Sequence, residues 1–168
     1  MTVAQLNAAD REQFTASIGF AFENSPWIAR AAWDRRPFAD VDDVLRAMAG
    51  VLEAASDEQR VALIAAHPDL AGRVAREGRL TAASRHEQSA AGLDRLTAQE
   101  LTLFDELNTA YRDRFGFPFV ICAREQTTAS ILRALERRAR NSREAEIETA
   151  LSEIEKIARL RLKDAVTP

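Results

Sequence analysis

The stretch VDDVLRAMAGVLEAASDEQRVALIAAHPDL, residues 41–70, carries the pattern that decides the fold class. Its first half repeats apolar residues three, four and seven positions apart, the spacing of one buried helical face. Ser56-Asp57 predicts the start of a second helix. That helix must end near His67, because Pro68 has no amide hydrogen and disfavours helical backbone in the residue before it. Two consecutive helices are therefore predicted.

The same helical spacing recurs along the chain between only six glycines and five prolines. Thr97-Ala-Gln-Glu100 is a capping-box pattern that predicts a helix start. The apolar run Phe117–Ala123 is predicted to be an extended segment or the start of a buried helix. A polar connection is expected over Asp69–Leu80. Further helices are predicted over about Asp10 to Asn24, from Ser25-Pro26 through Trp33, from Thr81 to Ala91, from Thr97 through Tyr111, from Thr128 to Arg140 and from Arg143 to Lys163.

No alternation typical of β-strands extends over a useful length. The pattern predicts an all-α fold, a single-domain helical bundle of about seven to nine helices. The chain has 168 residues, of which 46% are hydrophobic and 29% are charged, as is usual for a globular protein. One domain over residues 1–168 is the expectation.

The charge balance argues against a nucleic-acid partner, because 23 basic residues are outnumbered by 26 acidic ones. The arginine-rich stretch is interleaved with glutamates and is predicted to be a solvated face; its arginines are Arg133, Arg137, Arg138, Arg140 and Arg143. The single cysteine, Cys122, excludes an internal disulfide and indicates a reducing compartment. Without a signal-peptide pattern, a long apolar run or a peroxisomal ending, we expect a cytoplasmic protein with no membrane partner.

His67 is the first candidate for chemistry. An imidazole at a rigid, non-repetitive point suits proton transfer near neutral pH. The alternative is a histidine that caps the last carbonyls of its helix.

The segment Ser84-Arg-His-Glu-Gln88 is the second candidate. Glu87 and Gln88 together offer an anionic acceptor, an amide acceptor and two donors, which suits a planar urea-like or imide-like group. Two alternatives stand beside this interpretation. Ser84 and Glu87 also have capping-box spacing, and His86 is expected to be an exposed helical residue. His67, His86 and Glu87 could also be read as metal ligands, although no standard zinc spacing is present.

Arg161 is the third candidate, because it lies seven residues after Ile154 on the apolar stripe of the last helix. A guanidinium on a buried face needs an anion or several carbonyls. It could bind a substrate carboxylate, extend its tip to solvent, or pair with an internal carboxylate.

Taken together, these segments resemble the OHCU decarboxylase family, whose substrate is 2-oxo-4-hydroxy-4-carboxy-5-ureidoimidazoline. Five strings in order carry the resemblance: Phe22-Glu-Asn-Ser-Pro-Trp27, Ala66-His-Pro-Asp-Leu-Ala-Gly72, Ser84-Arg-His-Glu-Gln88 followed by Ala91-Gly-Leu93, Asn108 to Ala123 with Phe115-Gly-Phe-Pro-Phe119, and Ile157-Ala-Arg-Leu-Arg161-Leu162. One departure is Arg124-Glu125-Gln126, where relatives often have a glycine soon after the apolar segment.

The resemblance implies a cofactor-independent, metal-free enzyme of urate degradation, an all-helical homodimer that forms (S)-allantoin. It implies His67 as the catalytic acid/base and Glu87 as a second catalytic residue. Substrate contacts are implied at Pro68, Ser84, Arg85, His86, Glu87, Gln88, Phe119, Val120, Ile121, Cys122, Ala123 and Arg161. The alternative from another class is a non-enzymatic helical interaction module in which His67 and Arg161 are structural.

Overall fold

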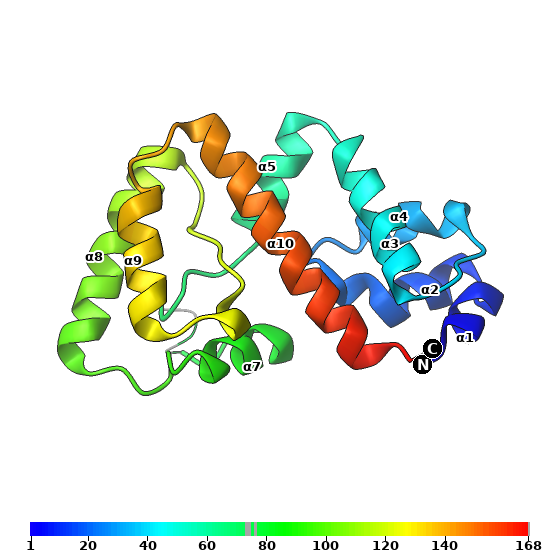
Figure 1. Ribbon diagram of the computed structural model, residues 1–168, viewed down its shortest axis with the longest axis horizontal. Coiled ribbons are helices and arrows are strands. Elements are labelled where there is room, and N and C mark those ends of the chain that lie inside the picture. The colour runs from blue at the N-terminus through cyan, green and yellow to red at the C-terminus, as the bar shows by residue number, and fades with distance from the viewer. Residues whose placement is uncertain (73–74, 76, 168) are drawn as a thin grey trace. The chain divides into compact units, whose positions relative to one another are not determined.

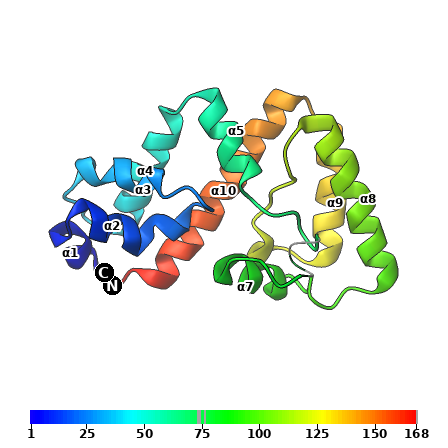
Figure 2. The ribbon, with the colours of Figure 1, turned by 180° about the vertical axis from the view of Figure 1, so that it is seen from behind.

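The computed structural model describes residues 1–72, 75 and 77–167. These residues form nine α-helices, three short 3-10 turns and no strand (Figures 1 and 2). The predicted all-α fold is confirmed. The helices are α1 (Val3–Ala8), α2 (Arg11–Ile18), α3 (Trp27–Ala32), α4 (Val41–Glu53), α5 (Asp57–Ala65), α7 (Ala82–Ala90), α8 (Ala98–Phe115), α9 (Thr128–Arg138) and α10 (Arg143–Ala165).

The chain divides into two compact units. Unit 1 comprises Met1–Ala66 and Glu155–Pro168, and unit 2 comprises His67–Ile154. The single domain over residues 1–168 stays a prediction. The predicted polar connection Asp69–Leu80 lies partly outside the described residues, so that part also stays a prediction. No described helix is long and apolar enough to cross a membrane.

Unit 1 is built around α3, which packs against both α2 and α4. Helices α2, α4 and α5 begin at side-chain caps: Asp10 and Ser56 each form a capping box, and the Asp40 side chain accepts from the Asp43 amide. The two chain ends lie together (Figure 2), with the Thr167 amide donating to the Met1 carbonyl over 2.8 Å.

Unit 2 contains α7, α8, α9 and the first half of α10, with α8 packed beside α9 (Figure 1). Its core is aromatic. The Tyr111 ring lies 4.5 Å from the Phe115 ring and 5.4 Å, edge-on, from the Phe119 ring. Such tilted and edge-on contacts are the favoured arrangement of aromatic rings.

A buried polar network supports this aromatic core. Glu146 is fully buried and pairs with Arg138, whose Nε donates to Oε2 over 3.0 Å. Glu146 also accepts from the hydroxyl of Tyr111 and, over 2.8 Å, from the amide of Asn141. Arg138 stacks over the Phe119 ring at 4.4 Å. The prediction that Arg138 belongs to a solvated face is therefore wrong, because its partners are a buried carboxylate and a buried ring.

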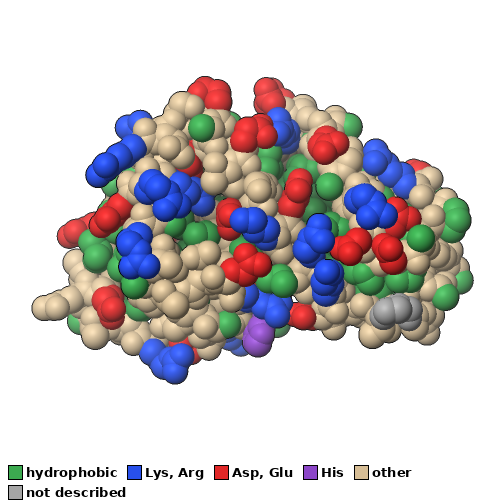
Figure 3. All heavy atoms as spheres, in the orientation of Figure 1, with side chains coloured by type: hydrophobic (Ala, Val, Ile, Leu, Met, Phe, Trp, Pro, Cys, Tyr) green, Lys and Arg blue, Asp and Glu red, His purple; other side chains and the backbone are tan. Residues whose placement is uncertain are grey.

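Acidic and basic side chains interleave elsewhere on the face of the molecule in Figure 3. Arg133, Arg137 and Arg140 are exposed as predicted. Arg143 is exposed too, although its Nε donates to the Phe115 carbonyl over 3.1 Å. The glutamate-interleaved pattern therefore predicted four of the five arginines correctly and missed Arg138, the member that is buried.

One predicted helix end and one predicted helix start are also wrong. The first predicted helix stops at Ile18, where 3-10 turn η1 (Gly19–Ala21) begins. A Cβ at Gly19 would lie 3.1 Å from the Pro26 Cβ, so the close approach of the two segments ends the helix. Helix α3 starts one residue later than predicted, with Pro26 as its cap and no side-chain capping bond from Ser25. Helix α1 was not predicted, because six residues are too short for a clear apolar stripe.

We expect Glu146→Ala to lower the free energy of unfolding by about 3 to 5 kcal/mol, because it leaves the Arg138 charge buried and uncompensated. Urea denaturation followed by circular dichroism measures this change. The matched control is Glu136→Ala on the exposed face of α9, expected within about 0.5 kcal/mol of the parent. Equal stability of the two variants would contradict the assignment.

Candidate active site

The predicted Ser84–Gln88 segment lies on α7 and is divided between two faces of that helix. Ser84, Glu87 and Gln88 are buried, with 4%, 7% and 6% of their surface exposed. Their spacing of three and four residues places them on one face. Arg85 and His86 are exposed. The structure therefore brings a hydroxyl, a carboxyl and an amide together and turns His86 away from them.

The capping interpretation of Ser84 is wrong. The cap of α7 is Thr81, whose hydroxyl accepts from the Ser84 amide over 3.2 Å. Ser84 is the third residue of the helix, so its side chain is inside the helix face rather than at its entrance. The threonine three residues earlier was the signal that sequence reasoning passed over.

His67 follows directly after α5, whose C-cap is Ala66. This position beyond the helix end is the one predicted from Pro68. His67 is buried, with 6% of its surface exposed, and Pro68 is half-buried. The imidazole is thus held at an irregular point of the backbone, away from bulk water.

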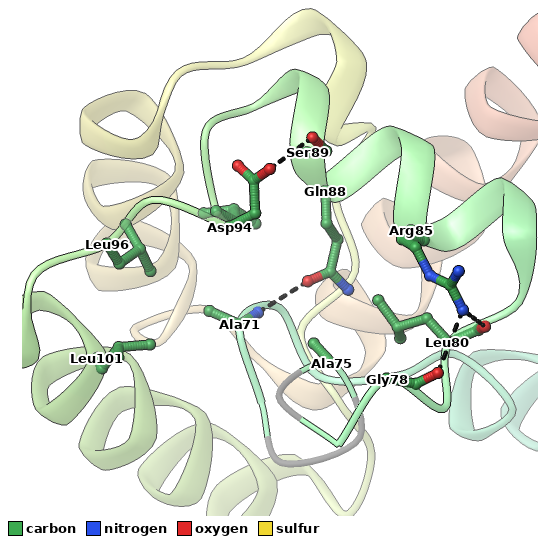
Figure 4. A pocket seen from close by; sticks show the side chains of 11 residues that line it. Ala71, Ala75, Gly78, Leu80, Arg85, Gln88, Ser89, Asp94, Leu96 and Leu101 are labelled. Carbon is green, nitrogen blue, oxygen red and sulfur yellow. Dashed lines mark hydrogen bonds between the residues drawn. The ribbon is translucent and has the colours of Figure 1, made fainter.

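The loop after His67 is fastened to α7 and α8 by side chains. The Gln88 amide oxygen accepts from the Ala71 amide over 3.0 Å (Figure 4). The Gln88 amide nitrogen donates to the Asp69 carbonyl over 3.5 Å. The Asn108 amide donates to the Leu70 carbonyl over 2.9 Å. On the exposed side, Arg112 pairs with the Asp69 carboxylate over 3.0 Å.

These contacts hold the loop in a backbone conformation that is costly by itself. Ala71 has a φ of 52°, a left-handed conformation that is costly for a residue with a Cβ. Such a backbone persists only where its surroundings over-determine it. Gln88 thereby fixes the loop that begins at His67, a positioning task that differs from the substrate contact predicted for it.

The segment Phe119–Ala123 is buried throughout and is extended up to 3-10 turn η3 (Ala123–Glu125). Of the two predicted possibilities, the extended one is confirmed. Two polar contacts hold its backbone: Arg138 donates to the Val120 carbonyl over 2.8 Å, and the Cys122 amide donates to the Glu153 carboxylate over 2.8 Å. Neither Arg138 nor Glu153 was recognised from sequence, since both look like surface charges on amphipathic helices.

The same segment lies beside the buried face of α7. Helix α7 packs against η3. Burial, followed by the nearby carboxylates of Glu125, Glu153 and Glu87, raises the pKa of the Cys122 thiol to about 11. Glu87 is thus close enough to Cys122 to act on its titration. Unit 2 assembles the His67 loop, the buried α7 face and the Phe119–Ala123 segment.

Arg161 lies in unit 1, where it is 4% exposed. Its guanidinium pairs with Glu23 over 2.9 Å and donates to the Phe20 carbonyl over 3.2 Å. The pairing with an internal carboxylate, one of the three sequence interpretations, is therefore present. Glu23 was not singled out from sequence, although it stands inside the Phe22–Trp27 string.

Unit 2 also contains a cavity of about 450 Å³, and both Ala71 and Gln88 line it (Figure 4). Its wall is mostly apolar, and its polar groups bind one another: Ser89 donates to Asp94 over 2.7 Å, and Arg85 donates to the Gly78 carbonyl over 3.2 Å. Of the predicted substrate-binding residues, only Arg85 and Gln88 line it. Among the described residues no group of three histidines, cysteines, aspartates or glutamates is placed to hold a metal ion, and this includes His67, His86 and Glu87.

The buried imidazole, carboxyl and amide of unit 2 are the side-chain types that carry out acid–base chemistry on a small polar molecule. The family model for OHCU decarboxylase matches residues 7–163, and the chain belongs to this family.

Two curated relatives are named 2-oxo-4-hydroxy-4-carboxy-5-ureidoimidazoline decarboxylase. The protein of Halalkalicoccus jeotgali is 40% identical over all of this chain and 93% of its own length. That of Mus musculus is 40% identical over 98% of this chain and 92% of its own length. Among solved structures, an (S)-allantoin synthase superimposes with a TM-score of 0.78 at 28% identity, covering 99% of this chain and 54% of that one.

We expect Cys122 to react with a chromogenic disulfide reagent at about pH 8 roughly a hundredfold more slowly than a free thiol, because the raised pKa keeps it protonated. The rate should increase as the pH rises toward about 11. Cys122 is the one cysteine, so the signal comes from a single group. The chain unfolded in guanidinium is the control, and a native rate equal to the unfolded rate would contradict the burial of this segment.

We expect Arg161→Ala to lower the free energy of unfolding by about 3 kcal/mol or more, because Glu23 then stays buried without its cation. Combining it with Glu23→Gln should restore part of the loss, since the double variant contains no unpaired charge. Urea titrations of the two single variants and the double variant measure the coupling. Additive effects would show that the pair contributes nothing to unit 1.

Proposed function

We propose that this chain catalyses the decarboxylation of 2-oxo-4-hydroxy-4-carboxy-5-ureidoimidazoline to (S)-allantoin in urate degradation. One observation carries the proposal: the loop that starts at the buried His67 is fastened by Gln88 to the helix face that also holds Glu87. The full-length similarity to relatives named for this reaction supports it.

The chemistry suits a protein that supplies no electron sink of its own. When the carbon–carboxylate bond breaks, the electron pair enters the electron-poor imidazoline ring of the substrate. The protein then has to orient the substrate, place charge and deliver one proton to the ring carbon. His67 performs the proton transfer, because its ordinary pKa lies near neutrality. Delivery to one face produces a single enantiomer.

The other residues hold the substrate around this imidazole. Glu87 accepts from the ureido and ring N–H groups. Gln88 keeps the His67 loop in place and offers its second amide N–H to the substrate. The backbone of Phe119–Ala123 offers donors and acceptors within an apolar wall. Ser84 and Pro68 complete the contacts, and Arg85, His86 and Arg161 stay proposals on the family resemblance alone.

Arg161 would have to divide its donors between Glu23 and an anionic group of the substrate. Sharing of this kind suits the reaction, since a tight grip on the departing carboxylate would stabilise the ground state and slow the loss of carbon dioxide. From the same resemblance we propose a cofactor-independent, cytoplasmic homodimer.

We expect His67→Asn to reduce turnover by about a hundredfold or more, the usual contribution of a general acid–base group. The substrate is generated fresh by urate oxidation and hydroxyisourate hydrolysis, and the chirality of the allantoin is followed by circular dichroism. Spontaneous decay gives a racemate, so optical purity reports the enzyme.

The control is Gln99→Asn, an exposed residue of α8 outside the proposed contacts, which should keep its turnover within about threefold of the parent. Activity of His67→Asn within about threefold would show that the assigned role is wrong. A non-enzymatic interaction module would leave the allantoin racemic with either protein.

A further inference from the structure

A second hollow, of about 260 Å³, lies in unit 2 behind the Phe119–Ala123 segment. All of its wall comes from that segment, the Gln126 turn, α9 and α10. The residues lining it are Ile121, Gln126, Ser130, Arg133, Ala134, Arg137, Arg138, Thr149 and Glu153. Ile121 belongs to the segment proposed to contact the substrate, and Arg138 and Glu153 position its backbone. The other six lining residues have no part in the chemistry proposed above.

The wall of this hollow contains both fastenings of the segment. Arg138, which holds the Val120 carbonyl, and Glu153, which holds the Cys122 amide, both line it. Ile121, the residue between those two peptide groups, lines it as well. Whatever occupies the hollow therefore touches the side chains that fix this segment.

Some charged groups in the hollow are ion-paired and others are not. Arg138 is neutralised by Glu146. Arg133 and Arg137 lie one helical turn apart on α9, and their guanidinium groups form no hydrogen bond or ion pair with any residue that the structure describes. Glu153 supplies one negative charge, and its Oε2 already accepts from Cys122. Two unengaged guanidinium groups against one carboxylate leave an excess of positive charge.

The neutral groups add a further donor. Gln126 accepts from the Ser130 hydroxyl through its amide oxygen over 2.8 Å, so its amide nitrogen keeps its hydrogens for another acceptor. Two guanidinium groups and an amide nitrogen are the donor set that recognises a tetrahedral or planar oxyanion. The volume is below that of a typical pocket for a larger organic ligand.

We propose that this hollow is a binding site for a small oxyanion such as phosphate, held by Arg133, Arg137 and Gln126. A bound anion places negative charge beside Glu153 and alters the hydrogen bond from the Cys122 amide. Occupancy is thereby coupled to the backbone of the Phe119–Ala123 segment. The consequence for catalysis rests on the proposed function, whereas anion binding does not.

Inorganic phosphate titrated into the ¹⁵N-labelled full chain tests the binding directly. Ionic strength is kept constant with sodium chloride, because screening alone shifts exposed charges. The amide resonances of Ile121 and Cys122 should move in a saturable way. The double variant Arg133→Ala/Arg137→Ala should weaken phosphate binding by about tenfold or more, since it removes both charge-assisted donors.

The matched control is Arg140→Ala, which removes an exposed arginine that does not line the hollow and should leave phosphate affinity unchanged. Equal affinity of the double variant and the parent would overturn the proposal, as would identical shifts with chloride alone.

A kinetic measurement tests separately whether phosphate binding in the hollow affects catalysis. Saturating phosphate should change the KM of the parent for its substrate and leave the KM of the double variant unchanged. Saturable binding with an unchanged parental KM would overturn the coupling and leave the anion site standing. Absence of turnover in every variant would refute the proposed function without affecting the binding measurement.

Discussion

The fastening of the His67 loop by Gln88 is the contact on which the rest of the site depends. A left-handed alanine would relax if its surroundings allowed it, and the loop would then carry the imidazole with it. Gln88 prevents this because its oxygen and nitrogen bind two different backbone groups of the same loop. One helix face thus sets the geometry of the loop and presents Glu87 in the same environment.

The Phe119–Ala123 segment is likewise held by side chains, in this case because its buried backbone groups need hydrogen-bond partners. An extended, buried backbone has polar groups that no helix or sheet satisfies, so each must find a side chain. Arg138 and Glu153 provide two such partners. Arg138 can be buried only because Glu146 is buried with it, and Glu146 in turn needs Tyr111 and Asn141. A chain of charge compensation therefore extends from α8 through α10 to the site.

The sequence alone predicted the helical fold, the position of His67 beyond α5 and the Thr97 cap, because period, proline and capping chemistry are local. It also found the α7 carboxyl and amide that the structure buries together. It did not find Glu23, Arg138, Glu146 or Glu153. Their partners lie 5 to 138 residues away along the chain. A buried arginine beside exposed ones has the same local pattern as its neighbours, so only tertiary packing distinguishes it.

Tyr111 is the one tyrosine of the chain, and its hydroxyl points at a buried carboxylate. Burial, followed by the bond to Glu146, raises the pKa of this phenol above its ordinary value of about 10. The native state therefore holds the phenolic proton under alkaline conditions in which the unfolded chain releases it, and stability present below about pH 10 is lost as the pH rises further. The ultraviolet band of tyrosinate thus becomes a built-in optical signal for alkaline unfolding of unit 2.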